Sequence, residues 1–321
     1  MTARNIHDIK ADYASGALAR DAYWSAMRES HLNLLDYQAL IREAGLDRIE
    51  IDAGELRVVL PSGLKFRWQP RDIRTVPNIL LNHGAYEPEV WAVLSHLARD
   101  SRVILDVGAN IGWYALHLAR LLDETGGMIY AFEPVPRTYA ELVRNVELNG
   151  YASRIVPCHH ALGESAGAAR FYIPAFTGSV AASRRQLFPD DANEAVECRV
   201  ETLDAVARAQ GIARVDLIKC DVEGSELFVL RGGAETIRRD QPIIMLEMLR
   251  KWARVFDYHP NDIIAFLGDL GYRCWSWDGA ELIPVPAVDD ACTQTNFFFL
   301  HDARHHDIPA RAAAMAAGAQ P

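Results

Sequence analysis

A glycine-containing turn between an expected strand and an expected helix constrains this chain more than any other feature. The turn runs from Asp106 to Gly112 in the form D-x-G-x-x-x-G. It follows an apolar run over residues 102–105 and precedes a helix in which Ala115 and Leu118 share one face. In open α/β sheets, ligands bind beyond the carboxyl ends of the strands. The turn therefore predicts a ligand site at a sheet edge.

The rest of the chain continues this alternation of strands and helices. The expected strands cover residues 102–105, 128–132, 154–158, 215–220, 242–247, 272–277 and 295–300. Residues 168–173 and 195–200 are expected to form a hairpin insertion. The pattern predicts an α/β fold with a Rossmann-like, seven-stranded, mostly parallel sheet and helices on both faces.

We expect three parts along the 321 residues. Residues 1–85 should form a helical extension and a β-hairpin, because Tyr37 and Ile41 recur at helical spacing and residues 56–68 alternate around a turn. Residues 86–301 should form the α/β domain. Residues 302–321 are rich in alanine and are expected to be a disordered tail.

Composition narrows the class of protein and its partners. The net charge is -10 and no Lys/Arg-rich run is present, so a nucleic-acid partner is not expected. No apolar stretch approaches the ~20 residues of a membrane span. Five scattered cysteines without a C-x-x-C pair are typical of free thiols, so we expect a cytoplasmic protein. A homo-oligomer is left open.

The glycine turn distinguishes between two cofactor classes. A nicotinamide enzyme needs G-x-G-x-x-G so that a pyrophosphate can lie on the helix N-terminus. Here Gly108 corresponds to the first glycine of that motif, but Asn110 occupies the position of the second. The form before us fits S-adenosylmethionine (SAM), which has no phosphates. Its ammonium group could be held by Asp106 at the strand end, with Gly108, Asn110 and Gly112 in the turn.

Three further residues are candidates for cofactor binding. Glu133 lies 21 residues after Gly112, which is the spacing of an acidic residue that accepts hydrogen bonds from ribose hydroxyls. His160 follows the third expected strand, near where an adenine edge would lie. Glu87 precedes Pro88 and either caps the helix that begins there or lies at the cofactor entrance.

Four segments together resemble the FkbM family of methyltransferases: Asp106–Gly112, Phe132–Pro134, Lys219–Glu226 and Asn296–Phe298. The resemblance covers roughly residues 84 to 300, and its most specific part is the K-x-D-x-E-G segment. It implies SAM-dependent methylation, usually of a hydroxyl oxygen on polyketides, sugars, glycans or other secondary metabolites. The substrate itself is not fixed by the resemblance.

Three carboxylates are candidates for the chemical step. Asp221 and Glu223 follow one expected strand and Glu247 ends the next, so all three should lie along one rim of the sheet. One hypothesis makes Asp221 the general base that takes the hydroxyl proton. A second makes the three carboxylates oxygen ligands of magnesium, which would acidify the hydroxyl.

Two other classes of function stay open on the sequence. A protein that binds the cofactor without turnover would keep the same fold. A nicotinamide-dependent oxidoreductase would share the Rossmann-like sheet, although Asn110 speaks against it.

Overall fold

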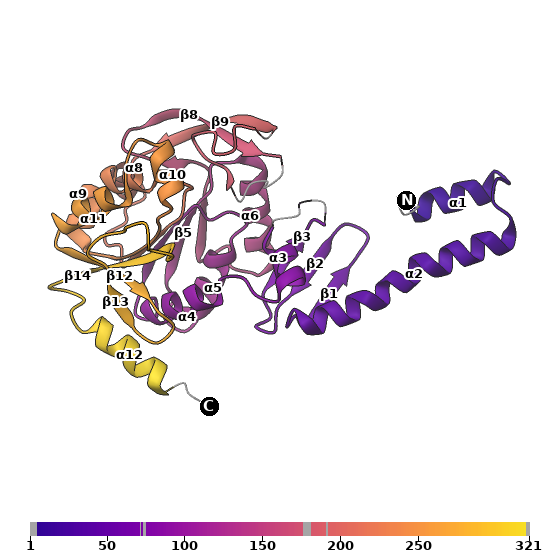
Figure 1. The fold of residues 1–321 in the computed structure, drawn as a ribbon, viewed down its shortest axis with the longest axis horizontal. Helices are drawn as coiled ribbons and strands as arrows, with labels where there is room; N and C mark the ends of the chain where they lie inside the picture. The colour runs from indigo at the N-terminus through magenta and orange to yellow at the C-terminus, as the bar shows by residue number, and fades with distance from the viewer. Residues whose placement is uncertain (1–4, 71, 73–74, 176–180, 191, 319–321) are drawn as a thin grey trace.

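An eight-stranded sheet forms the centre of the computed structural model, which describes residues 5–70, 72, 75–175, 181–190 and 192–318 (Figure 1). The strand order is β13-β12-β14-β11-β10-β4-β5-β6. The strands are β4 Val103–Val107, β5 Met128–Phe132, β6 Ile155–Cys158, β10 Leu217–Cys220, β11 Ile243–Glu247, β12 Tyr272–Trp277, β13 Leu282–Pro284 and β14 Asn296–His301.

The pairing confirms the Rossmann-like α/β fold. Strands β11, β10, β4, β5 and β6 are parallel, whereas β14, β12 and β13 pair antiparallel. The expected number of seven strands is wrong by one, because β13 adds a strand of three residues, which is too short to show a period in the sequence.

The register of the parallel strands brings their carboxyl ends together. Val107 of β4 lies opposite Cys220 of β10 and Phe132 of β5, and Cys220 lies opposite Leu246 of β11. The turns that follow these strands therefore leave the sheet side by side. Residues far apart in the sequence meet at this edge.

Helices cover both faces of the sheet, as expected. Along β4, Ile104 and Leu105 belong to different apolar cores, because successive side chains of a strand point to opposite faces. One core includes α4 Pro88–Leu97, α5 Trp113–Leu121 and α6 Pro136–Leu148. The other core includes α7 Leu203–Ala209, α8 Glu226–Arg231, α9 Ala234–Asp240 and α11 Pro260–Gly268. Helix α10 Arg250–Val255 follows β11.

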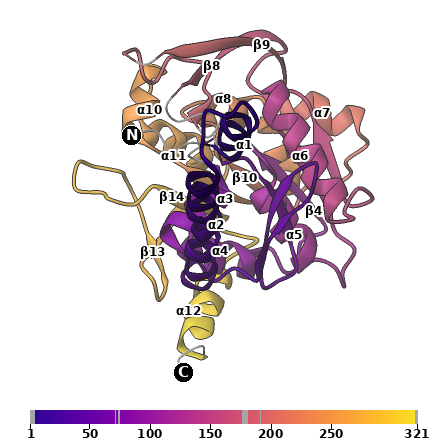
Figure 2. The ribbon, with the colours of Figure 1, turned by 90° about the vertical axis from the view of Figure 1, so that its right-hand side faces the viewer.

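The insertion after β6 forms a small sheet in the order β7-β9-β8. Its strands are β7 Ala161–Leu162, β8 Gly167–Pro174 and β9 Asn193–Glu201. The antiparallel pairing of β8 with β9 confirms the expected hairpin. Both views show this hairpin above the central sheet (Figures 1 and 2).

The N-terminal part is larger than a helix and a hairpin. It contains α1 Ile6–Ala14, α2 Arg20–Glu43, β1 Arg48–Ile51, β2 Leu56–Val59, β3 Lys65–Trp68 and α3 Val76–His83. Strands β2 and β3 form the expected hairpin, and β1 adds a third strand. Helices α1 and α2 extend away from the body of the molecule (Figure 1). No helix within the described ranges is long and apolar enough to cross a membrane.

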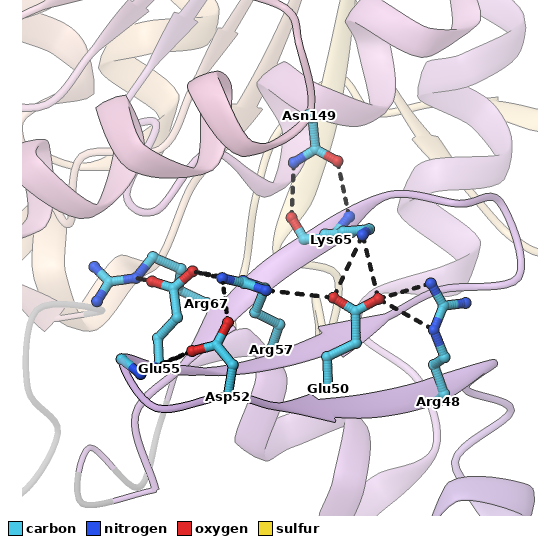
Figure 3. A network of polar contacts seen from close by, with 9 residues as sticks. Arg48, Glu50, Asp52, Glu55, Arg57, Lys65, Arg67 and Asn149 are labelled. Atoms are coloured by element: carbon cyan, nitrogen blue, oxygen red, sulfur yellow. Dashed lines mark hydrogen bonds and ion pairs between the residues drawn. The ribbon is translucent and has the colours of Figure 1, made fainter.

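Ion pairs and a side-chain amide fix this small sheet, as Figure 3 shows. Arg57 lies between Glu50 and Asp52, with nitrogen–oxygen distances of 3.6 and 2.8 Å. Asn149, just after α6, accepts from the backbone N–H of Lys65 at 2.8 Å and donates to its carbonyl at 2.7 Å. The sheet is thereby joined to the α/β domain.

The C-terminal tail differs from the expectation of disorder. Residues Ile308–Gly318 form α12, and Ile308 and Ala312 are buried against the core that contains α4. Alanine is the best helix former, and a few buried apolar side chains suffice to hold such a helix against a surface. Residues 319–321 lie outside the described part.

Candidate active site

A cavity of ≈ 380 Å³ opens where β4, β5, β10 and β11 end. Pockets of ~300–1,000 Å³ are typical of sites for small molecules. The charged and amide side chains of its wall are Glu87, Asn110, Glu133, Lys219, Asp221, Glu223, Glu247 and Lys251. The cavity thus brings together seven residues predicted for the site: Glu87, Gly108, Asn110, Glu133, Asp221, Glu223 and Glu247.

The glycine turn after β4 packs directly on the turn after β10. Gly108 has φ +80, and a Cβ placed there would come within 1.8 Å of the carbonyl oxygen of Asp221. Only glycine allows this approach, since both the backbone angle and the space exclude a side chain. Asn110 is also left-handed, with φ 50.

Glu133 is held rigidly at the end of β5. Its Oε2 accepts from the backbone N–H of Asn110 at 3.1 Å, and its Oε1 accepts from that of Val135 at 2.9 Å. The carboxyl is only 6% exposed, and burial raises its pKa to about 7 even though the two hydrogen bonds favour the charged form.

Asp221, Glu223 and Glu247 form the carboxylate rim that was predicted. Each offers an oxygen, and these oxygens all lie within 4.8 Å of one another. Burial, together with the neighbouring charge of Asp221, raises the pKa of Glu223 and of Glu247 well above the usual range for glutamate. Glu223 also has φ 53, a conformation that side chains rarely adopt.

Glu226 holds the turn that carries this rim. Its Oε1 accepts from the backbone N–H groups of Val222 and Gly224 at 3.0 and 3.1 Å, and Tyr258 donates to its Oε2. Glu226 is the first residue of α8, so these bonds join the helix to the turn before it. The carboxyl fixes the backbone around Glu223.

Glu87 lies at the cavity on a strained backbone, with φ 45. Tyr114 donates a hydrogen bond of 2.5 Å to its Oε2. Burial raises the pKa of Glu87, while the bond from Tyr114 opposes that shift. Its side chain makes no cap to helix α4, which argues against the capping role. Its place at the cofactor entrance stays a prediction.

Three predicted residues do not line the cavity in the described part of the chain: Asp106, Gly112 and His160. Asp106 is fully buried behind the glycine turn, and Gly112 packs against Leu142 at the start of α5. His160 lies edge-on to Phe132, and burial lowers its pKa. Their expected contacts with a cofactor stay predictions.

Lys219 is the main residue that the sequence analysis left without a role. Its side chain is 3% exposed, and its Nζ lies 3.5 Å from Asp106 and 3.5 Å from Asp221. Burial alone would lower its pKa, but the two carboxylates raise it above the usual range for lysine. The group stays charged inside the wall.

The insertion and α10 close the cavity with apolar side chains. Phe171 and Phe188 come from the insertion and Trp252 from α10, and the rings of Phe188 and Trp252 have centroids 5.3 Å apart. Ser183 donates a 2.8 Å hydrogen bond to the carbonyl of Glu223, so this roof is fixed to the carboxylate rim.

Comparison with known proteins places this site in a family. Residues 106–274 match the family model described as the methyltransferase FkbM domain. The chain belongs to the FkbM methyltransferase family. The resemblance noted in the sequence is thereby confirmed.

Curated relatives of the family share a part of this chain. The match to methyltransferase sdnD of Sordaria araneosa is 32% identical and covers 40% of this chain and 59% of that protein. The match to 31-O-demethyl-FK506 methyltransferase FkbM of Streptomyces tacrolimicus is 34% identical and covers 42% and 60%. That to the hexuronic acid methyltransferase AglP of Haloferax volcanii is 26% identical and covers 58% and 73%. The chain therefore spans about three fifths of the length of the first two relatives.

The residues of the FkbM methyltransferase site offer both acceptors and donors to a cofactor. Five carboxyl groups and two lysines line the cavity. Trp113 adds a buried indole N–H that has no partner within the described ranges. The three carboxylates of the rim are also the kind of oxygen ligand that magnesium prefers.

Proposed function

We propose that this FkbM-family protein is a SAM-dependent O-methyltransferase acting on a small molecule or a glycan. The observation that carries the proposal is the meeting of the glycine turn, Glu133 and the carboxylate rim at one cavity. When bound, SAM supplies an electrophilic methyl group. A hydroxyl oxygen forms the new C–O bond, the C–S bond breaks, and the hydroxyl proton must be taken up.

The cofactor side of the cavity is formed by Gly108, Asn110 and Glu133. Glu133 is oriented by two backbone N–H groups, so its remaining lone pairs can accept from ribose hydroxyls. Asp106, buried behind the turn, is linked to this side of the cavity through Lys219, whose Nζ lies 3.5 Å from its Oδ1.

Asp221 is the residue we assign as the general base. Burial raises the pKa of Glu223 and of Glu247, which favours their neutral forms and makes them less suited to bind the hydroxyl proton as charged bases. Asp221 lies beside Lys219 and lines the cavity. It is therefore the carboxylate of the rim that accepts the hydroxyl proton.

A metal-assisted route is the second candidate, and the oxygen atoms of the rim favour it because they lie within 4.8 Å of one another. Magnesium held by Asp221, Glu223 and Glu247 would acidify the hydroxyl in place of a base. Full activity after exhaustive chelation would exclude this route and leave Asp221 as the base.

The roof of the cavity supports a ring-shaped acceptor. Phe188 and Trp252 offer apolar faces beside the carboxylates. A hydroxylated ring could pack on these aromatic faces while its hydroxyls form hydrogen bonds with the carboxylates. The names of two relatives, one acting on a demethylated FK506 and one on a hexuronic acid, agree with this class of substrate. We retain residues 86–301 as the catalytic domain. The cytoplasmic location stays a prediction, and a homo-oligomer stays open.

Transfer of a labelled methyl group from SAM tests the proposal. Sugars, glycans and polyketides with free hydroxyls serve as acceptors, and the label should appear in an ether. Asp221→Asn should abolish transfer while SAM still binds. Full transfer by Asp221→Asn would remove the assignment of the base.

A further inference from the structure

The buried Lys219 ammonium lies among three oxygen atoms of the protein. Its Nζ donates to the carbonyl of Gly108 at 3.1 Å and lies 3.5 Å from Asp106 Oδ1 and 3.5 Å from Asp221 Oδ2. The carbonyl of Gly108 accepts one hydrogen bond from this ammonium, and the two carboxylates lie at ion-pair distance. The ring of Tyr114 lies 5.2 Å from the same nitrogen. The surroundings of Lys219 are therefore formed by groups of the protein itself.

The partners of Lys219 belong to two different turns. Asp106 and Gly108 belong to the end of β4 and the cofactor turn, and Asp221 begins the turn of the carboxylate rim. Lys219 is the register partner of Asp106 in the parallel pair of β10 with β4. The two turns also touch at Gly108 and Asp221. Lys219 thus lies across the contact between the cofactor side and the acceptor side.

We propose that Lys219 is a positioning residue that fixes the cofactor turn and Asp221 relative to each other. The proposal rests on the proposed function, because SAM is taken as the ligand of the cofactor turn. Without Lys219, the carboxylates of Asp106 and Asp221 would face each other without their shared cation, and the Gly108 carbonyl would lose its donor. The turn would then bind SAM poorly.

Two other roles for Lys219 predict different results. SAM carries a net positive charge and S-adenosylhomocysteine (SAH) carries none. If Lys219 acted only as a distant charge, its removal would leave the wall more acidic and would strengthen SAM binding relative to SAH. If it only stabilised the fold, thermal stability would fall and the affinity of the folded protein would not change. A positioning role predicts weaker binding of both ligands, because both use the same turn.

Isothermal titration calorimetry of the full chain with SAM and with SAH separates these roles. Lys219→Met should weaken the binding of both ligands by at least about tenfold, which is about 1.4 kcal/mol in the free energy of binding. Lys10→Met is the control. Lys10 is an exposed lysine of α1 and does not line the cavity. Its loss removes the same charge and should leave the affinity for both ligands unchanged.

Lys219→Arg keeps the charge but moves the donors, and it decides the matter if the Met variant does not fold. Positioning predicts that the Arg variant binds both ligands more weakly than the wild type, though better than any folded Met variant. Wild-type affinity in Lys219→Arg, or unchanged or tighter binding in Lys219→Met, would overturn the proposal. If the wild type binds neither SAM nor SAH, the proposed function itself fails.

Discussion

Two groups of carboxylates in this molecule differ in the direction of their pKa shifts. On the N-terminal sheet (Figure 3), hydrogen bonds lower the pKa of two carboxylates. The largest contribution comes from Arg48 for Glu50 and from the backbone N–H of Gly54 for Asp52. At the cavity, burial raises the pKa of Glu133, Glu223 and Glu247. Carboxylates therefore stabilise the fold on the N-terminal sheet, whereas at the cavity burial disfavours their charged form. Such opposition is typical of a functional site.

The largest expected difference between the two regions concerns two glycines with similar backbone angles. Gly108 has φ +80 and no space for a Cβ, whereas Gly63, between β2 and β3, has φ +85 and open space around it. Gly108→Ala should cost about 3 kcal/mol or more in the free energy of unfolding, and Gly63→Ala about 1 kcal/mol. Urea unfolding followed by tryptophan fluorescence measures both. Equal losses would show that the contact with Asp221 is absent.

The pH dependence of SAM binding gives the next largest effect. Glu133 has a pKa of about 7, and only its carboxylate form accepts from both ribose hydroxyls and the backbone. Affinity for SAM should rise by about tenfold from pH 6 to pH 8. Glu133→Gln should bind more weakly and lose this dependence. A wild-type affinity that stays level across this interval would argue against a role of Glu133 in binding.

The free energy of unfolding should depend on pH through the raised pKa of Glu247. In the unfolded chain Glu247 loses its proton near pH 4.3, but in the folded protein its raised pKa keeps the proton bound at higher pH. The native state then binds more protons, so stability falls as pH rises above that value. Glu247→Gln should be more stable than the wild type by about 1 kcal/mol at pH 8, and this gain should vanish near pH 4. Denaturation at both pH values measures it.

The smallest effect is expected on the N-terminal sheet and has the opposite sign. Burial alone would raise the pKa of Glu55, but hydrogen bonds from Arg57 and Arg67 lower it. Its contribution to stability is therefore present above the unfolded pKa and is lost as pH falls through the folded value. Glu55→Gln should be slightly less stable than the wild type at pH 7 and equal to it at low pH. A gain in stability at pH 7 would remove the contrast between the two regions.

Much of the fold could be predicted because its signals are local. Apolar runs marked the long strands, and the turn from Asp106 to Gly112 marked the site. Strand β13 and the two-residue β7 are too short to show a period. Helix α12 was not predicted, because the alanine-rich composition of the tail was interpreted as low sequence complexity. Alanine is also the best helix former.

The site residues that follow the ends of strands could be predicted from the sequence. Residues whose contacts depend on how two strands pair could not. Asp221, Glu223 and Glu247 meet because β10 and β11 end side by side. The role of Lys219 depends on its register with Asp106, which no single stretch of sequence shows. A lysine inside an otherwise apolar strand was the signal that could have found it, since a buried lysine needs a partner.

Calorimetry of the full chain with SAM, SAH and NAD tests the central claim most directly. SAM and SAH should both bind, because the cavity offers the glycine turn and Glu133. NAD should not bind, since Asn110 stands where a nicotinamide enzyme needs glycine. Binding of NAD without binding of SAM or SAH would contradict the account.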